Sequence, residues 1–271
     1  MSLAGLPPLD IGERAHRLRA RFDDAGVDAL LVTRRPNVRY LTGFTGSAAM
    51  VLVGTDDIVF VTDGRYAEQS ADQLAAAGVG ARIEVGLTQA AQREALAAAV
   101  AGSARLGLEA HGVTWAQQRA FAGEWFPAAE LVATEHLVED LRRVKEPGEV
   151  ARIGAACGIA DESLGEVAPG FADGPTERQV ALELELAMRR RGATGVSFDP
   201  IVASGPNGAR PHARPSDRRL APRELVVLDF GCVIDGYCSD MTRTVSVGAP
   251  SADAAHLYDV VLQAQQAGRD T

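Results

Sequence analysis

One stretch of this 271-residue chain, residues 225–247, constrains the fold more than any other. An apolar run that contains Asp229 leads into Asp235-Gly236 and then into a second strand-like run that contains Asp240. An Asp-Gly pair between two such runs is the strongest short-range sequence signal for a β-hairpin. The stretch therefore predicts two antiparallel strands joined by a tight turn.

The two aspartates are expected to leave the same face of this hairpin. A turn centred on residues 234–235 makes Asp229 and Asp240 direct partners, and a turn centred on residues 235–236 makes them diagonal neighbours. In either register their Cβ atoms lie within about 5 to 8 Å of each other. Carboxylates this close repel each other unless a proton or a cation lies between them. Two divalent metal ions, about 3.5–4 Å apart, would suit this geometry.

A hairpin with one solvated face explains the same alternation without any metal. Four apolar side chains fall on one face: Val226, Leu228, Phe230 and Met241. Both aspartates fall on the other face, which they share with Leu225 and Val227. These two apolar residues indicate that the aspartate face is not simply solvent. The spacing by itself leaves the metal site and the solvated face as open alternatives.

The composition argues against several classes of partner. The formal net charge of −9 and the pI near 5.1 argue against a nucleic acid or an anionic membrane surface as the main partner. No apolar run approaches the roughly 18 residues of a membrane span, and the first residues lack the features of a secretory signal. The three cysteines have no zinc-site or disulfide spacing and are expected to be small buried thiols. We therefore expect a cytoplasmic protein.

The remaining pattern predicts an α/β organisation. Helices are expected at residues 10–26, 65–77, 89–101, 114–125, 149–167 and 251–267, and strands at residues 27–32, 48–53, 58–62 and 106–109. Residues 34–37 are expected to form a turn. Thr176 and Gln179 form a capping box that begins a further helix, which Gly192 ends. A charged segment that ends in Pro-Gly predicts two domains, residues 1–142 and 143–271.

A loop rich in proline and glycine, residues 204–215, contains His212. Pro211 fixes its own φ and restricts the residue before it, so the histidine sits in a stiff loop. At this point His212 can be interpreted either as a catalytic or substrate-binding imidazole or as a solvated loop histidine. Three further histidines are expected to be structural or exposed: His16, His111 and His136.

Motifs in both halves of the chain resemble those of the pita-bread metallopeptidases, most closely the Xaa-Pro dipeptidase (prolidase) and aminopeptidase P branch. In the second half these motifs are IVASGPN (201–207), Pro-His (211–212), VLDFG (227–231) and GYCSDMTRT (236–244). Residues 26–31, 37–44 and 63–66 resemble the creatinase-type N-terminal domain that precedes the catalytic domain in these enzymes. The resemblance implies an α/β (α+β) fold. It consists of a creatinase-type domain with a central sheet and then the first half of a pita-bread catalytic domain.

The resemblance also implies roles for individual residues. Asp229 matches the first metal ligand, Asp240 the carboxylate that bridges two ions, and His212 the histidine near the scissile bond. Thr242 would be a hydrogen-bond donor that orients Asp240. The implied reaction is hydrolysis of small peptides with proline at the second position, by a water that bridges two divalent metals. The resemblance implies manganese first, with cobalt or zinc as alternatives, and a homodimer.

The chain departs from the family in its metal ligands. The family completes its site with one histidine and two glutamates well after the hairpin, whereas the last glutamate here is Glu224. The one histidine after Asp240 is His256, in a predicted helix. Three of five ligands are therefore expected to be missing, and the chain is expected to be a truncated, inactive part of a longer enzyme. Two alternatives are a non-catalytic binding or regulatory protein that keeps the fold, and a metal-free creatinase-type amidinohydrolase. The paired carboxylates speak against the latter.

Overall fold

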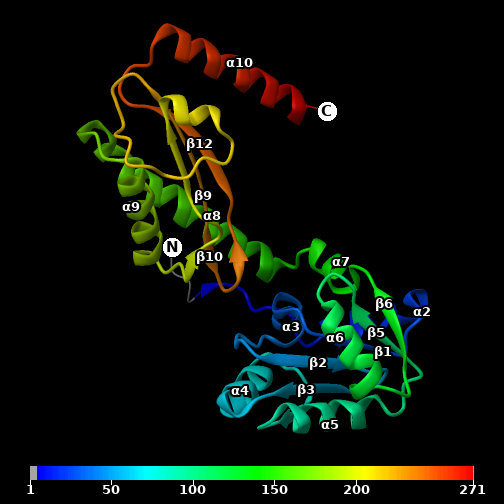
Figure 1. Ribbon diagram of the computed structural model, residues 1–271. Helices are drawn as coiled ribbons and strands as arrows, with labels where there is room; N and C mark the ends of the chain where they lie inside the picture. Colours follow the sequence, from blue (N-terminus) through cyan, green and yellow to red (C-terminus); the bar gives the residue numbers. More distant parts are fainter. Residues whose placement is uncertain (1–4, 271) are drawn as a thin grey trace. The chain divides into compact units, whose positions relative to one another are not determined.

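The structure, a computed structural model, describes residues 5–270 and separates into two compact units. One unit consists of residues 8–146, and the other combines the segment before Pro8 with the chain from Pro147 onward. Each unit contains helices and strands (Figure 1), which confirms the predicted mixed α/β class. The expected domain boundary at residues 142/143 stays a prediction. Among residues 5–270, no helix has the length and apolar character needed to cross a membrane.

A six-stranded mixed sheet organises residues 8–146, with the strand order β4-β3-β2-β1-β5-β6. Its strands are β1 (Ala29–Val32), β2 (Ala49–Val53), β3 (Ile58–Thr62), β4 (Arg82–Val85), β5 (Arg105–Glu109) and β6 (Glu130–Thr134). β1 pairs antiparallel with β2 and parallel with β5, and β5 pairs parallel with β6. Because β5 and β6 run in the same direction, the segments that follow them begin at the same edge of the sheet.

Helices pack on both faces of this sheet, because its strands are apolar on both sides. Leu30 and Val32 belong to one buried cluster, and Ala29 and Leu31 belong to another. The helices are α1 (Arg14–Arg19), α2 (Phe22–Ala25), α3 (Arg35–Thr42), α4 (Ala67–Ala76), α5 (Gln89–Val100), α6 (Trp115–Ala120) and α7 (Leu137–Arg143). Short helical turns precede α4 (η2, Gly64–Tyr66) and follow α6 (η3, Phe121–Trp125).

Several elements of this unit differ from the sequence-based expectation. The turn expected at residues 34–37 is instead the start of α3, because Pro36 lies in the first helical turn, where its missing N–H removes no hydrogen bond. The single helix expected at residues 10–26 is divided into α1 and α2. The hydrophobic pattern also failed to indicate β4, β6 and α7, which are short.

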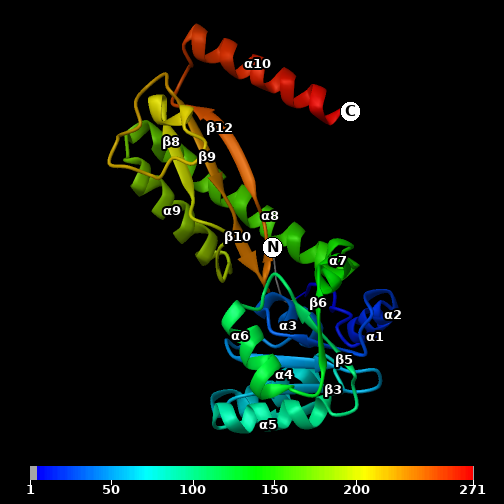
Figure 2. The ribbon, with the colours of Figure 1, turned by 45° about the vertical axis from the view of Figure 1, so that its right-hand side comes forward.

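Two three-stranded sheets and a pair of packed helices form the second unit. The sheets have the orders β11-β10-β7 and β12-β9-β8. Their strands are β7 (Gly195–Val196), β8 (Ile201–Ser204), β9 (Leu225–Phe230), β10 (Cys232–Ile234), β11 (Tyr237–Cys238) and β12 (Met241–Ser246). α8 (Pro147–Val167) and α9 (Glu177–Arg190) pack against one face of these strands, as both ribbon views show (Figure 2). Two short helical turns, η4 (Ala168–Asp173) and η5 (Gly205–Ala209), complete the unit together with α10 (Ala252–Arg269).

The ends of α9 confirm the predicted capping box. The Thr176 hydroxyl accepts a hydrogen bond from the Gln179 amide, and the Gln179 side chain accepts one from the Thr176 amide. Gly192, just beyond the helix, has a φ of 101°. The expectation of three buried cysteines is wrong for two of them. Only Cys232 is buried, whereas Cys157 on α8 and Cys238 on the edge strand β11 are exposed.

Candidate metal centre

The hairpin adopts the second of the two registers left open by the sequence. Asp235 and Gly236 have φ values of 49° and 81°. Positive φ at both central residues is the property of a type I′ turn, which matches the twist of the strands on either side. Ile234 pairs with Tyr237, so the turn is centred on residues 235–236.

Asp229 and Asp240 are consequently diagonal neighbours on one face of the hairpin. Asp229 lies directly opposite Thr242, two residues beyond Asp240. The four residues expected on the other face are all buried: Val226, Leu228, Phe230 and Met241. This apolar face packs with α8 and α9 in one cluster, so the aspartates lie on the face away from these helices.

The strand ladder of the hairpin is interrupted between its two aspartates and its turn. β9 and β12 belong to one sheet and β10 and β11 to the other, with Gly231 between β9 and β10. A Cβ atom on Gly231 would lie only 1.9 Å from the carbonyl oxygen of Ser239. The Cys232 amide donates to the Ser239 hydroxyl and the Ser239 amide donates to the Cys232 carbonyl, each over 3.0 Å. The close backbone approach therefore holds the strand segment that immediately precedes Asp240.

Thr242 donates its hydroxyl hydrogen bond to Asp229 Oδ1 at 3.0 Å. The expectation that Thr242 orients Asp240 is therefore wrong. The reason is the register, which places Thr242 directly across the ladder from Asp229. Asp229 is half-buried and Asp240 is exposed. Within residues 5–270, the structure gives Asp240 no hydrogen bond or ion pair.

All three residues proposed from the sequence line one cavity of about 730 Å³: His212, Asp229 and Asp240. The wall of this cavity also includes Phe198, Asp199 and Arg214. Asp229 comes from β9, Asp240 directly precedes β12, and His212 comes from the loop after η5. The cavity therefore brings together side chains from separate segments of the chain.

Glu177, the first residue of α9, holds the loop that carries His212. Its carboxylate is fully buried and accepts hydrogen bonds from the amide and hydroxyl of Ser204, at 2.7 and 2.8 Å. It also accepts from Asn207 Nδ2 at 3.0 and 3.1 Å, and from the amide and hydroxyl of Ser216 at 3.0 and 2.6 Å. Burial raises the pKa of Glu177, but the hydrogen bonds from Ser216, Ser204 and Asn207 outweigh it and lower the pKa from 4.5 to about 2.

Both parts of the chain match known family models. Residues 14–144 match the creatinase/prolidase N-terminal domain, and residues 151–271 match metallopeptidase family M24. An uncharacterized peptidase of Bacillus subtilis, YqhT, is 39% identical over 255 residues, which cover 94% of this chain and 71% of that protein. The Xaa-Pro dipeptidase of Pyrococcus horikoshii is 28% identical, with 94% and 70% coverage.

Solved structures also match this chain over most of its length. A structure titled Xaa-Pro dipeptidase from Bacillus anthracis superposes with a TM-score of 0.87 at 38% identity, over 94% of this chain and 70% of that one. An X-Pro aminopeptidase structure from Thermotoga maritima has a TM-score of 0.83 at 30% identity, over 93% and 70%. The chain belongs to metallopeptidase family M24, with a creatinase/prolidase N-terminal domain.

Proposed function

We propose that Asp229 and Asp240 bind divalent metal and that His212 contacts the substrate, in the hydrolysis of Xaa-Pro peptide bonds. The observation that carries this proposal is the shared cavity of about 730 Å³, which all three side chains line. The names Xaa-Pro dipeptidase and X-Pro aminopeptidase among the relatives support the substrate class, small peptides with proline at the second position.

The donor set fits a hard or borderline divalent ion. Carboxylate oxygens suit manganese, which we propose as the preferred metal, with cobalt or zinc as alternatives. Asp240 has no partner among the described residues, and the Thr242 hydroxyl occupies only one oxygen of Asp229. We propose two ions with Asp240 as the bridge. Two carboxylates hold such a pair weakly, so we expect residues 1–271 alone to be inactive and activity to need three further ligands.

The residues of the chain itself would orient the reacting groups. Bound metal ions supply a water of lowered pKa and polarise the scissile carbonyl. Thr242 holds Asp229 in one orientation through its hydrogen bond. His212, kept in place by Pro211 and by the Glu177 hydrogen bonds at the base of its loop, would steady the negative charge that develops on the carbonyl oxygen.

We also propose that the protein acts as a homodimer in the cytoplasm. The homodimer rests on the family resemblance, and the cytoplasmic location rests on the composition and on the cysteines, which have no disulfide spacing. Sedimentation equilibrium measures the oligomeric state, and cell fractionation measures the location.

Manganese binding tests the role of Asp240. We expect Asp240→Asn to weaken Mn²⁺ binding at least about tenfold, because it removes one of two anionic ligands. The measurement is electron paramagnetic resonance of free Mn²⁺ during titration. Asp199→Asn is the matched control, because Asp199 is an exposed aspartate that lines the same cavity. Equal binding by wild type and Asp240→Asn, or equal losses in both variants, would contradict the proposal.

Cleavage of an Xaa-Pro dipeptide tests the reaction. A preparation that mass spectrometry shows to end at Thr271 is expected to be inactive with Mn²⁺. The same chain joined to the part of the Bacillus subtilis relative that it does not match is expected to cleave, and to lose cleavage on Asp229→Asn. Metal-dependent cleavage by residues 1–271 alone would refute the expected inactivity. A joined protein that folds and binds Mn²⁺ without cleaving would favour the non-catalytic alternative.

A further inference from the structure

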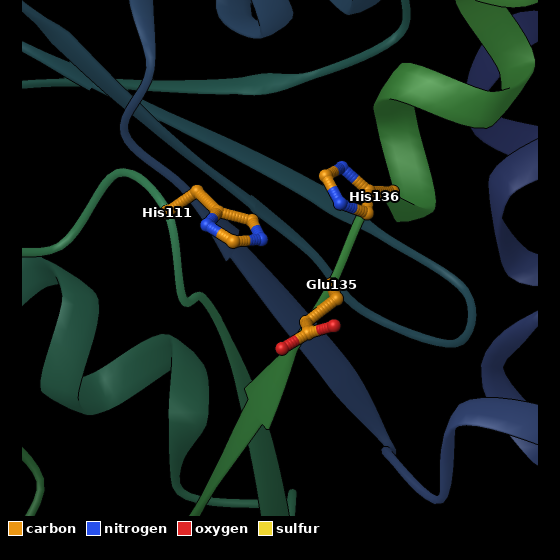
Figure 3. A group of neighbouring side chains, drawn as sticks. All are labelled: His111, Glu135 and His136. Atoms are coloured by element: carbon orange, nitrogen blue, oxygen red, sulfur yellow. The ribbon is translucent and has the colours of Figure 1, made fainter.

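Two histidines and a glutamate meet at one edge of the six-stranded sheet. The ligand atoms of His111, Glu135 and His136 all lie within 4.8 Å of one another. The imidazole rings are stacked, with centroids 4.7 Å apart and an angle of 25° between the ring planes. Figure 3 shows the two rings next to each other, with the Glu135 side chain below them at the end of β6.

The pairing of β5 with β6 produces this arrangement. Glu109 and Thr134 are the last residues of these strands and are partners in the parallel ladder. The Ala110 amide extends the ladder by donating to the Thr134 carbonyl at 3.0 Å. His111 and Glu135, which follow directly, therefore leave the same sheet edge. The site is fixed by a regular strand pair and does not depend on a long loop.

The backbone at His136 brings the third side chain into the group. In an extended strand, successive side chains point to opposite faces. His136 interrupts this alternation with a φ of 58°, a left-handed conformation in which histidine is several-fold enriched among non-glycine residues. This turn lets Glu135 and His136 approach the same point although they are adjacent in sequence.

All three donor groups are available to a ligand. The three residues are exposed, and within the described part of the chain the structure gives none of their side chains a hydrogen bond or an ion pair. A pocket beside both histidines, which Glu109 and Arg34 also line, has a volume of about 10 Å³. That volume is about the smallest that holds one water molecule, and Glu135 does not line it, so this pocket is not itself the position of the ion.

We propose that His111, Glu135 and His136 bind one divalent transition-metal ion, Zn²⁺ or Co²⁺, in the unit of residues 8–146. Imidazole nitrogen favours these ions over Mg²⁺, Ca²⁺ and Mn²⁺, which prefer oxygen ligands. Two histidines and one glutamate are a known zinc ligand set that leaves a fourth position for water. The bound ion joins the turn after β5 to the start of α7 and stabilises this edge of the sheet.

Cobalt binding tests the proposal in the full chain. The titration uses an Asp229→Asn, Asp240→Asn background, which removes the carboxylate pair of the other unit. The visible absorption of bound Co²⁺ reports binding and coordination number, and thermal unfolding with added Zn²⁺ reports stabilisation. The test variant is His136→Asn, because asparagine also tolerates the left-handed backbone. His16→Asn, an exposed histidine on α1, is the matched control.

The expected result is one Co²⁺ per chain, with affinity at least tenfold lower in His136→Asn and unchanged in His16→Asn. Zn²⁺ should raise the melting temperature of the background protein and not that of His136→Asn. His111→Gln, which leaves the unusual backbone position intact, should reproduce the loss if His136→Asn folds poorly. Binding that survives both substitutions, or no Co²⁺ binding in the background protein, would overturn the proposal.

Discussion

Gly231→Ala is expected to destabilise the unit of residues 147–270 by at least about 3 kcal/mol. A methyl group at this position would lie 1.9 Å from the Ser239 carbonyl oxygen, a distance that no rotamer can relieve. Ser239 cannot move away without disturbing the two hydrogen bonds that its hydroxyl and amide make with the Cys232 backbone. Because Asp240 follows Ser239, manganese binding should fall together with stability.

Urea unfolding followed by circular dichroism measures this loss. Both tryptophans of the chain, Trp115 and Trp125, lie in the unit of residues 8–146, so their fluorescence is an internal reference that should not shift. Gly195→Ala is the matched control, because β7 carries Gly195 in the neighbouring sheet and no atom lies within 4 Å of its added Cβ. A Gly231→Ala protein that unfolds at the wild-type urea concentration would show that the backbone around Gly231 and Ser239 makes room for the methyl group without a loss of stability.

Glu177 should give the same unit an acid-sensitive stability of about 3 kcal/mol. Its folded pKa of about 2 lies below its ordinary value of 4.5, so the unfolded chain binds a proton first as pH falls. The stabilisation is therefore complete above about pH 4.5 and is lost between pH 4.5 and pH 2. Glu177→Gln should lower stability at pH 7 and flatten the pH dependence in that window.

The measurement is urea unfolding at several pH values between 2 and 7. Glu183→Gln is the control, because Glu183 is an exposed glutamate on the same helix. Parallel pH profiles for wild type and Glu177→Gln would mean that the buried carboxylate does not supply the acid sensitivity. Local disorder of the loop around His212 would appear as faster amide exchange at Ser204 or Ser216, because the glutamine NH2 group replaces one of the two oxygens that accept from these amides.

The hairpin shows which features could be predicted from the sequence. Strict alternation and the Asp-Gly pair predicted the buried face and limited the register to two choices, because both signals lie within a few residues of one another. The close backbone approach at Gly231 was not predictable in this way. Its cause is the Ser239 carbonyl on the opposite strand, and an isolated glycine in a strand does not identify its neighbour.

The missed features depend on contacts between distant parts of the chain. Glu177 was only an acidic residue in a capping box, whereas its hydrogen-bond partners lie 27 to 39 residues further along. His111 and His136, which were expected to be structural or exposed, are exposed. Their proximity follows from the pairing of β5 with β6, and the short run of residues 130–134 gave no clear strand signal.

The hydrogen bonds that Glu177 accepts at both ends of the His212 loop have an evolutionary consequence. One carboxylate holds Ser204 and Asn207 before the loop and Ser216 after it, so the path of the backbone is set at its ends. Residues 208–215 between these points carry part of the cavity wall. Substitutions there can change which peptides fit while the ends of the loop remain in place. Selectivity can therefore diverge among relatives without a loss of folding stability.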